Sequence, residues 1–210
     1  MLQLGILRGV KLDKQVPKKL WIIIPIITFL AIVAFLVIEK ANQSRSNLPT
    51  YGEVPDFAFK DSQGKQFGRD ELLGKISIID FFFTSCRGPC PVMSSNMAEL
   101  YQAFSTSDQV QLVSISVDPE VDTPEVLNQY AEAHGVTDNR WRFLRADLAA
   151  VIKLSEKGFH LAAENLPSMH STKFILVDEN AEIRGYYSGT DEASMKILIS
   201  DVRQLVKKIE

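Results

Sequence analysis

The chain of 210 residues has only two cysteines and three histidines. Both cysteines, Cys86 and Cys90, lie in one short segment, so no cysteine elsewhere is left for a disulfide framework. A disulfide across three intervening residues would stabilise a large domain little, because the loop that it closes is short. We therefore expect these thiols to be redox-active or metal-binding rather than structural.

The sequence also lacks internal repeats, low-complexity tracts and an excess of basic residues. Residues 1–40 carry six Lys or Arg and two Asp or Glu, a formal charge of +4, which leaves −7 for the rest of the formal −3. This acidic remainder argues against a protein that binds nucleic acid.

Charged residues are absent from the apolar segment 20–38. At about 1.5 Å per residue, its length is sufficient to cross a hydrocarbon core of about 30 Å. The Lys and Arg residues within 1–19 predict a cytoplasmic N-terminus and a single transmembrane anchor. No small-residue cleavage site follows the segment, because Glu39 and Lys40 stand there, so a cleaved signal peptide is disfavoured.

The first nineteen residues hold one Arg and no Ser, whereas mitochondrial import signals are rich in both. We therefore expect the anchor to lie in the inner membrane of a bacterium and the C-terminal domain to be periplasmic. Residues 39–50 are polar and aperiodic and are expected to form a tether. Residues 51–210 are long enough for one domain with its own core.

The apolar patterns of this domain predict alternating strands and helices. In chain order they predict a hairpin at 57–67, a helical turn at 69–73, a strand at 76–83, a helix at 91–105, a strand at 110–117, a helix at 124–134, a strand at 142–145, a helix at 147–157, a hairpin at 173–187 and a helix from about 191. Thr123 and Thr190 are the expected N-caps of two of the helices. This order predicts a mixed α/β sheet with helices on its faces, similar to the thioredoxin fold with insertions.

The two cysteines lie at the junction between the strand at 76–83 and the helix at 91–105. The unpaired N–H groups at a helix start, together with Arg87, are expected to favour a thiolate at Cys90. A thiolate is both the nucleophile of disulfide chemistry and a metal ligand. The sequence alone leaves both roles open.

Three segments carry a resemblance to a known family. They are Phe-Thr-Ser-Cys-Arg-Gly-Pro-Cys-Pro at 83–91, Ser-Val-Asp-Pro-Glu-Val-Asp-Thr-Pro-Glu at 116–125, and the stretch from His170-Ser171 through the strand that ends at Asp178 to Arg184-Gly185-Tyr186-Tyr187. Together they resemble the Sco (SenC-type) family of membrane-anchored copper proteins over roughly residues 51–208. The resemblance implies a thioredoxin-like fold with insertions, preceded by one N-terminal transmembrane helix.

The resemblance also implies a copper ion bound by Cys86, Cys90 and His170. It implies a role in assembling the copper centre of a respiratory cytochrome oxidase, with the oxidase copper subunit or another extracytoplasmic copper or thiol protein as partner. Two thiolates and an imidazole suit Cu(I) and can also bind Cu(II). Oxidation of the same thiols to a disulfide would prevent binding, so metal loading and redox state are coupled.

Other residues of similar chemistry have simpler interpretations. Met93 and Met97 lie four residues apart on an apolar helix face and are expected in the core. His134 precedes a helix-ending glycine, where a histidine complements the helix dipole. Asp118 and Asp122 stand in Asp-Pro and Asp-Thr-Pro sequences, which are typical of turns and helix caps.

Two residues depart from the Sco pattern. Arg87 stands where Sco-like loops usually have proline, and Asp80 falls where thioredoxins keep a buried acid. These departures favour an alternative, an extracytoplasmic thiol–disulfide oxidoreductase that uses Cys86 and Cys90. The three-residue spacing of the cysteines and the presence of His170 argue against it. A peroxidase-like enzyme is the weakest hypothesis, because the surroundings of an activated peroxidatic cysteine are not recognisable.

Overall fold

The computed structural model describes residues 20–45 and 48–209. The chain separates into two compact units, Met1–Asn47 and Leu48–Glu210. The first contains helix α1 (Leu20–Arg45), which includes the segment expected to form the anchor. No helix in the described part of the chain was found to combine the length and the hydropathy that a membrane crossing requires. The expected cytoplasmic segment 1–19 lies outside the described residues, so the topology stays a prediction.

The second unit is built on one eight-stranded sheet with the order β1-β8-β7-β4-β5-β6-β2-β3. The strands are β1 (Gly52–Glu53), β2 (Ala58–Asp61), β3 (Gln66–Gly68), β4 (Ile76–Phe82), β5 (Val110–Ser116), β6 (Trp141–Arg145), β7 (Lys173–Val177) and β8 (Glu182–Ser188). The helical elements are η1 (Asp70–Leu72), α2 (Cys90–Ala103), α3 (Pro124–Ala133), α4 (Leu148–Lys153), the π-helical turn η2 (Leu154–Gly158) and α5 (Glu192–Ile209). The predicted mixed α/β architecture is confirmed, and the short strand β1 is an addition to it.

The central strand β4 determines where the functional loops meet. It pairs in parallel with β5 and antiparallel with β7, and β5 pairs in parallel with β6. One end of the sheet therefore holds the carboxyl ends of β4, β5 and β6 together with the start of β7. Every residue of β4 is buried, as expected for a strand that is covered on both faces.

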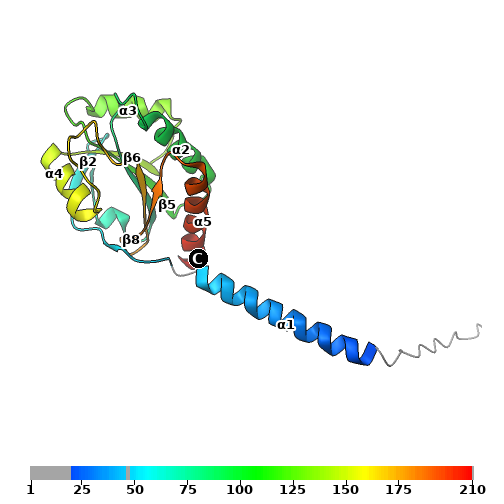
Figure 1. The fold of residues 1–210 in the computed structure, drawn as a ribbon. Coiled ribbons are helices and arrows are strands. Elements are labelled where there is room, and N and C mark those ends of the chain that lie inside the picture. The colour runs from blue at the N-terminus through cyan, green and yellow to red at the C-terminus, as the bar shows by residue number, and fades with distance from the viewer. Residues whose placement is uncertain (1–19, 46–47, 210) are drawn as a thin grey trace, which may run out of the picture. The chain divides into compact units, whose positions relative to one another are not determined.

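Helices cover both faces of the sheet (Figure 1). Helices α2, α3 and α5 pack on one face, where they meet Ile78 and Phe82 of β4. Helix α4 and η2 pack on the other face, where they meet Ile79 and Phe81. Because side chains alternate along a strand, the Asp80 side chain points toward the face covered by α2.

Capping explains two of the helix boundaries. The Thr123 side chain accepts a hydrogen bond from the Val126 backbone N–H, and Pro124 is the first residue of α3, as predicted. The prediction that Thr190 caps the last helix is wrong. Asp191 does so instead, because its carboxylate accepts a hydrogen bond of 2.7 Å from the Ser194 backbone N–H. A carboxylate at a helix N-terminus also interacts favourably with the helix dipole.

Candidate metal centre

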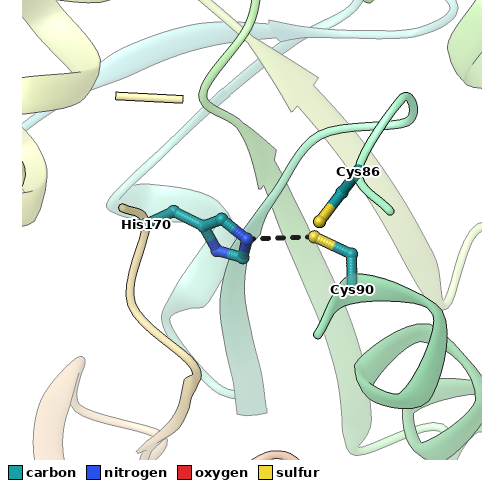
Figure 2. A group of neighbouring side chains, drawn as sticks. All are labelled: Cys86, Cys90 and His170. Atoms are coloured by element: carbon teal, nitrogen blue, oxygen red, sulfur yellow. Dashed lines mark hydrogen bonds between the residues drawn. The ribbon is translucent and has the colours of Figure 1, made fainter. Parts of the chain in front are cut away.

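Three residues predicted from the sequence converge at the end of the sheet where β4 ends and β7 begins. Cys86 is half-buried in the loop after β4, and Cys90 is the first residue of α2 and only 1% exposed. His170 lies in the loop that leads into β7 and is 8% exposed. One ligand atom from each of the three lies within 4.8 Å of the others. Figure 2 shows the imidazole directed at the Cys90 sulfur, with the Cys86 sulfur beside it.

Hydrogen bonds determine which nitrogen of His170 carries the proton. Nδ1 lies 3.1 Å from the carbonyl oxygen of Ser171, which can only accept. This contact favours the tautomer in which Nδ1 carries the hydrogen and Nε2 presents its lone pair to the Cys90 sulfur at 3.1 Å. A metal-binding histidine is commonly fixed in this way, with its second nitrogen bonded to a backbone carbonyl.

The protonation state of Cys90 differs from the sequence-based expectation. Burial, together with the neighbouring Cys86, raises the pKa of the Cys90 thiol to about 12, and a hydrogen bond from the backbone of Phe83 only partly offsets this. Arg87 is exposed, so it does not compensate for the loss of hydration. The expected stabilisation of a thiolate by the helix start is therefore wrong for the metal-free protein. Metal binding by Cys90 must release its proton.

The imidazole is prepared for binding a metal. Burial lowers the pKa of His170, which favours the neutral ring. The ring of Phe83 meets it edge-on, with 5.5 Å between centroids and an interplanar angle of 90°. A neutral ring held in one orientation, with Nε2 directed at the two thiols, is the form that binds metals.

The donor set fits copper. It consists of two thiols and an imidazole, and within the described residues no carboxylate joins this cluster. Soft sulfur donors suit Cu(I), and also Zn²⁺, whereas Mg²⁺, Ca²⁺ and Mn²⁺ prefer oxygen ligands. The two cysteines are free thiols, which is the state that binding requires. Cys86 is the most accessible of the three residues, so an approaching metal ion or protein would meet it first.

Other candidate residues lie elsewhere. Met93 and Met97 lie on the inner face of α2 and are fully buried in the core, as predicted. His134 is the C-cap residue of α3, and its ring packs against that of Tyr130 in a tilted arrangement, with 4.4 Å between centroids. Within the described residues, none of these belongs to the three-donor cluster.

Asp80 is an unusual residue beneath the site. Asp80 is 1% exposed and lies in the interior strand β4. Its carboxyl group therefore does not reach water, as it could on an edge strand. Ser114 provides a side-chain hydrogen bond, but Oδ1 finds no partner within the described part of the chain. Burial raises the pKa of Asp80 to about 7 despite the bond from Ser114.

Sequence comparisons agree with the resemblance. A SCO1/SenC family model matches residues 46–207. A SCO1 protein homolog of Bacillus subtilis is 28% identical over 161 residues, which is 74% of this chain and 83% of the relative. A Stutzerimonas stutzeri protein named for copper binding is 30% identical over 149 residues, which is 66% of this chain and 71% of the relative.

Solved structures show the same fold. A SCO1/SenC family lipoprotein from Bacillus anthracis has a TM-score of 0.68 and 33% identity, covering 74% of this chain and 95% of that one. BsSco, described as a Sco-family cytochrome c oxidase assembly protein with a disulfide switch, has a TM-score of 0.68 and 27% identity, covering 77% and 98%. The predicted thioredoxin-like fold of the Sco type is confirmed for residues 48–209.

Proposed function

This chain belongs to the SCO1/SenC family, and we propose that it binds a copper ion through Cys86, Cys90 and His170 and delivers it to the copper centre of a respiratory cytochrome oxidase. The observation that carries the proposal is the convergence of two thiols and one imidazole within 4.8 Å. The related protein BsSco, described as belonging to a family of oxidase assembly proteins, supports the choice of acceptor.

The placement of the donors suits binding followed by release. Cys90 and His170 are buried, so they hold a copper ion away from water, whereas Cys86 remains half-exposed. A thiolate or imidazole of an acceptor protein reaches the metal from the Cys86 side. The protons of the two thiols leave when copper binds, so affinity is expected to increase with pH.

A transfer experiment tests this proposal. The reduced protein loaded with Cu(I) is mixed with the metal-free copper-binding domain of an oxidase subunit, and the copper content of each is measured after separation. We expect transfer to be faster than copper release to a small chelator, with a rate that rises with acceptor concentration. Transfer no faster than release to the chelator would contradict direct delivery.

We also propose that residues 20–38 anchor the protein in the inner membrane, with the N-terminus in the cytoplasm and the copper-binding unit in the periplasm. The support is the uncharged segment and the basic residues that precede it. The described large apolar side chains of α1, from Ile24 to Leu36, are exposed. Membrane fractionation of the full chain and of residues 48–210 tests this, since only the full chain should sediment with membranes after an alkaline wash.

A second function, thiol–disulfide exchange, is favoured by the buried Asp80 carboxyl group beneath the cysteine pair, whose Oδ1 has no hydrogen-bond partner among the described residues. In such a reaction the accessible Cys86 attacks a partner disulfide and forms a mixed disulfide. Cys90 then displaces the partner, which leaves with two thiols while Cys86 and Cys90 become a disulfide. The partner gains the two electrons that the cysteine pair loses.

Replacing Asp80 with asparagine is expected to stabilise the protein at neutral pH. Burial raises the pKa of Asp80 from 3.8 to about 7, so between these values the folded protein holds a proton that the unfolded chain has released. Wild-type stability therefore falls as pH rises from about 4 to about 7, by up to about 4 kcal/mol at 1.36 kcal/mol per pKa unit. Urea unfolding at pH 4.5 and pH 8 should show the advantage of the variant appearing only at pH 8.

Asp80→Asn also tests whether the protein carries out thiol–disulfide exchange in addition to copper delivery. Negative charge on Asp80 raises the pKa of Cys90, so Asp80→Asn should change the pH profile of disulfide exchange if that reaction is physiological. A variant with altered stability but an unchanged exchange profile would leave Asp80 with a structural role alone. An advantage in stability that is equal at both pH values would contradict its titration in the folded protein.

A further inference from the structure

Asp122 connects the ends of two neighbouring strands. It lies in the loop between β5 and α3 and is 0% exposed. Its Oδ1 accepts hydrogen bonds from the Thr84 backbone N–H at 3.2 Å and from Thr84 Oγ1 at 2.5 Å. Its Oδ2 accepts one from Ser116 Oγ at 2.5 Å. Burying a carboxylate is costly unless such donors replace its lost hydration, so these hydrogen bonds stabilise Asp122 in this position.

The loop that contains Asp122 is itself held firmly. The Asp122 backbone N–H donates to the Asp118 carbonyl at 2.9 Å, and the Asp118 N–H donates to Ser116 Oγ at 3.1 Å. The Val117 N–H donates to the Phe82 carbonyl at 2.8 Å, which joins this loop to the end of β4. The carboxylate is therefore a fixed point against which Thr84 is held.

Thr84 belongs to a segment, residues 83–86, that touches all three donors of the metal centre. Cys86 is part of it, and its backbone N–H donates to the Phe83 carbonyl at 3.3 Å. Phe83 also packs against the core cluster that contains Cys90. The Phe83 ring meets the His170 ring edge-on. A displacement of this segment would disturb all three donors at once.

We propose that Asp122 is a positioning residue that holds Thr84, and with it residues 83–86, in the geometry where the two thiols and the imidazole converge. The expected effect of Asp122 on copper binding rests on the proposed function. Its effect on the positions of the thiols rests only on the contacts in the metal-free protein. Asp122 thus has a role beyond the turn expected from its sequence, and the helix cap is supplied by the adjacent Thr123.

The test compares Asp122→Asn, Thr84→Val and their double variant in the reduced, full-length protein. Thr84→Val keeps the backbone N–H that Asp122 binds but removes the hydroxyl. The matched control is Asp61→Asn, because Asp61 is also a buried carboxylate that accepts two backbone N–H bonds and pairs with Arg142, away from the cysteine loop. Thermal unfolding of every variant measures the general loss of stability.

Two readouts distinguish positioning from simple stabilisation. One is the Cu(I) dissociation constant, measured by competition with a chelator. We expect Asp122→Asn to weaken binding about 10- to 100-fold, the usual cost of removing a group that orients metal ligands. The other is the alkylation rate of Cys90 in the metal-free protein, followed by peptide mass. Because Cys90 is 1% exposed, its alkylation requires local opening and should become several-fold faster.

The combination of variants identifies the route of the effect. If Asp122 acts through Thr84, the double variant should be little worse than Asp122→Asn alone, because neighbouring residues in one network are not additive. Asp61→Asn should lower the unfolding temperature without changing either readout. If Asp122→Asn fails to fold, Thr84→Val carries the test, with a smaller change in the same direction.

The results separate this inference from the proposed function. Unchanged copper affinity and unchanged Cys90 alkylation in Asp122→Asn, with a loss of stability like that of Asp61→Asn, would overturn the positioning role and leave copper delivery untouched. Faster Cys90 alkylation in a protein whose wild-type form binds no copper would support the positioning role while the copper proposal fails.

Discussion

Replacing Cys90 with serine is expected to abolish both tight copper binding and reversible disulfide formation. Serine preserves the size of the side chain but replaces a soft sulfur donor with a hydroxyl, which does not suit Cu(I). Loss of a direct ligand should weaken copper binding by more than roughly 100-fold, which is the largest usual effect of losing a residue that only orients a ligand. Anaerobic competition titration measures the affinity, and thiol counting before and after mild oxidation measures the disulfide.

The control for this variant is Met93→Leu. Met93 also carries sulfur and lies one turn after Cys90, but it is fully buried in the core. Leucine is close to methionine in volume, so stability and copper affinity should both change little. Native copper affinity in Cys90→Ser would mean that the metal binds elsewhere, and it would remove the basis for the proposed function.

Replacing His170 with alanine is expected to separate copper binding from disulfide formation, the two activities proposed for the cysteine pair. The Nε2 atom of His170 lies 3.1 Å from the Cys90 sulfur, so alanine removes the nitrogen donor and leaves both thiols in place. Copper should bind substantially more weakly and with an altered absorption spectrum. The thiols should still form a disulfide, since oxidation needs only the two sulfur atoms.

His134→Ala provides a histidine control for this experiment. The ring of His134 packs on Tyr130 at the end of α3 and takes no part in the three-donor cluster. Its removal should lower stability but leave the copper affinity unchanged. If His170→Ala bound copper as tightly as the wild type, the site would be a dithiol site, and the role of His170 would have to be structural.

The sequence predicts the framework of the site because its strongest signals are local. The apolar run before Cys86 and the helical spacing after Cys90 predict a strand–loop–helix junction, and the structure confirms β4 and α2 there. The position of His170 beside the thiols does not follow from local sequence pattern alone. It depends on β7 lying antiparallel to β4, which brings the start of β7 to the end of β4.

What the sequence could not predict depends on tertiary packing. The helix start at Cys90 favours a thiolate locally, but burial beneath neighbouring elements has the larger effect and raises the pKa of Cys90 to about 12. The contact between Asp122 and Thr84 joins residues that are 38 positions apart. It arises because β4 and β5 pair in parallel with Phe82 opposite Ser116, a register that hydrophobic pattern alone does not determine.

X-ray absorption spectroscopy of the reduced, Cu(I)-loaded protein tests the central claim most directly, because it reports the atoms bound to copper. We expect two sulfur donors and one nitrogen donor in the wild type, with the nitrogen lost in His170→Ala and one sulfur lost in Cys90→Ser. A wild-type spectrum with two sulfur donors and no nitrogen, or with no sulfur at all, would contradict a copper site formed by Cys86, Cys90 and His170.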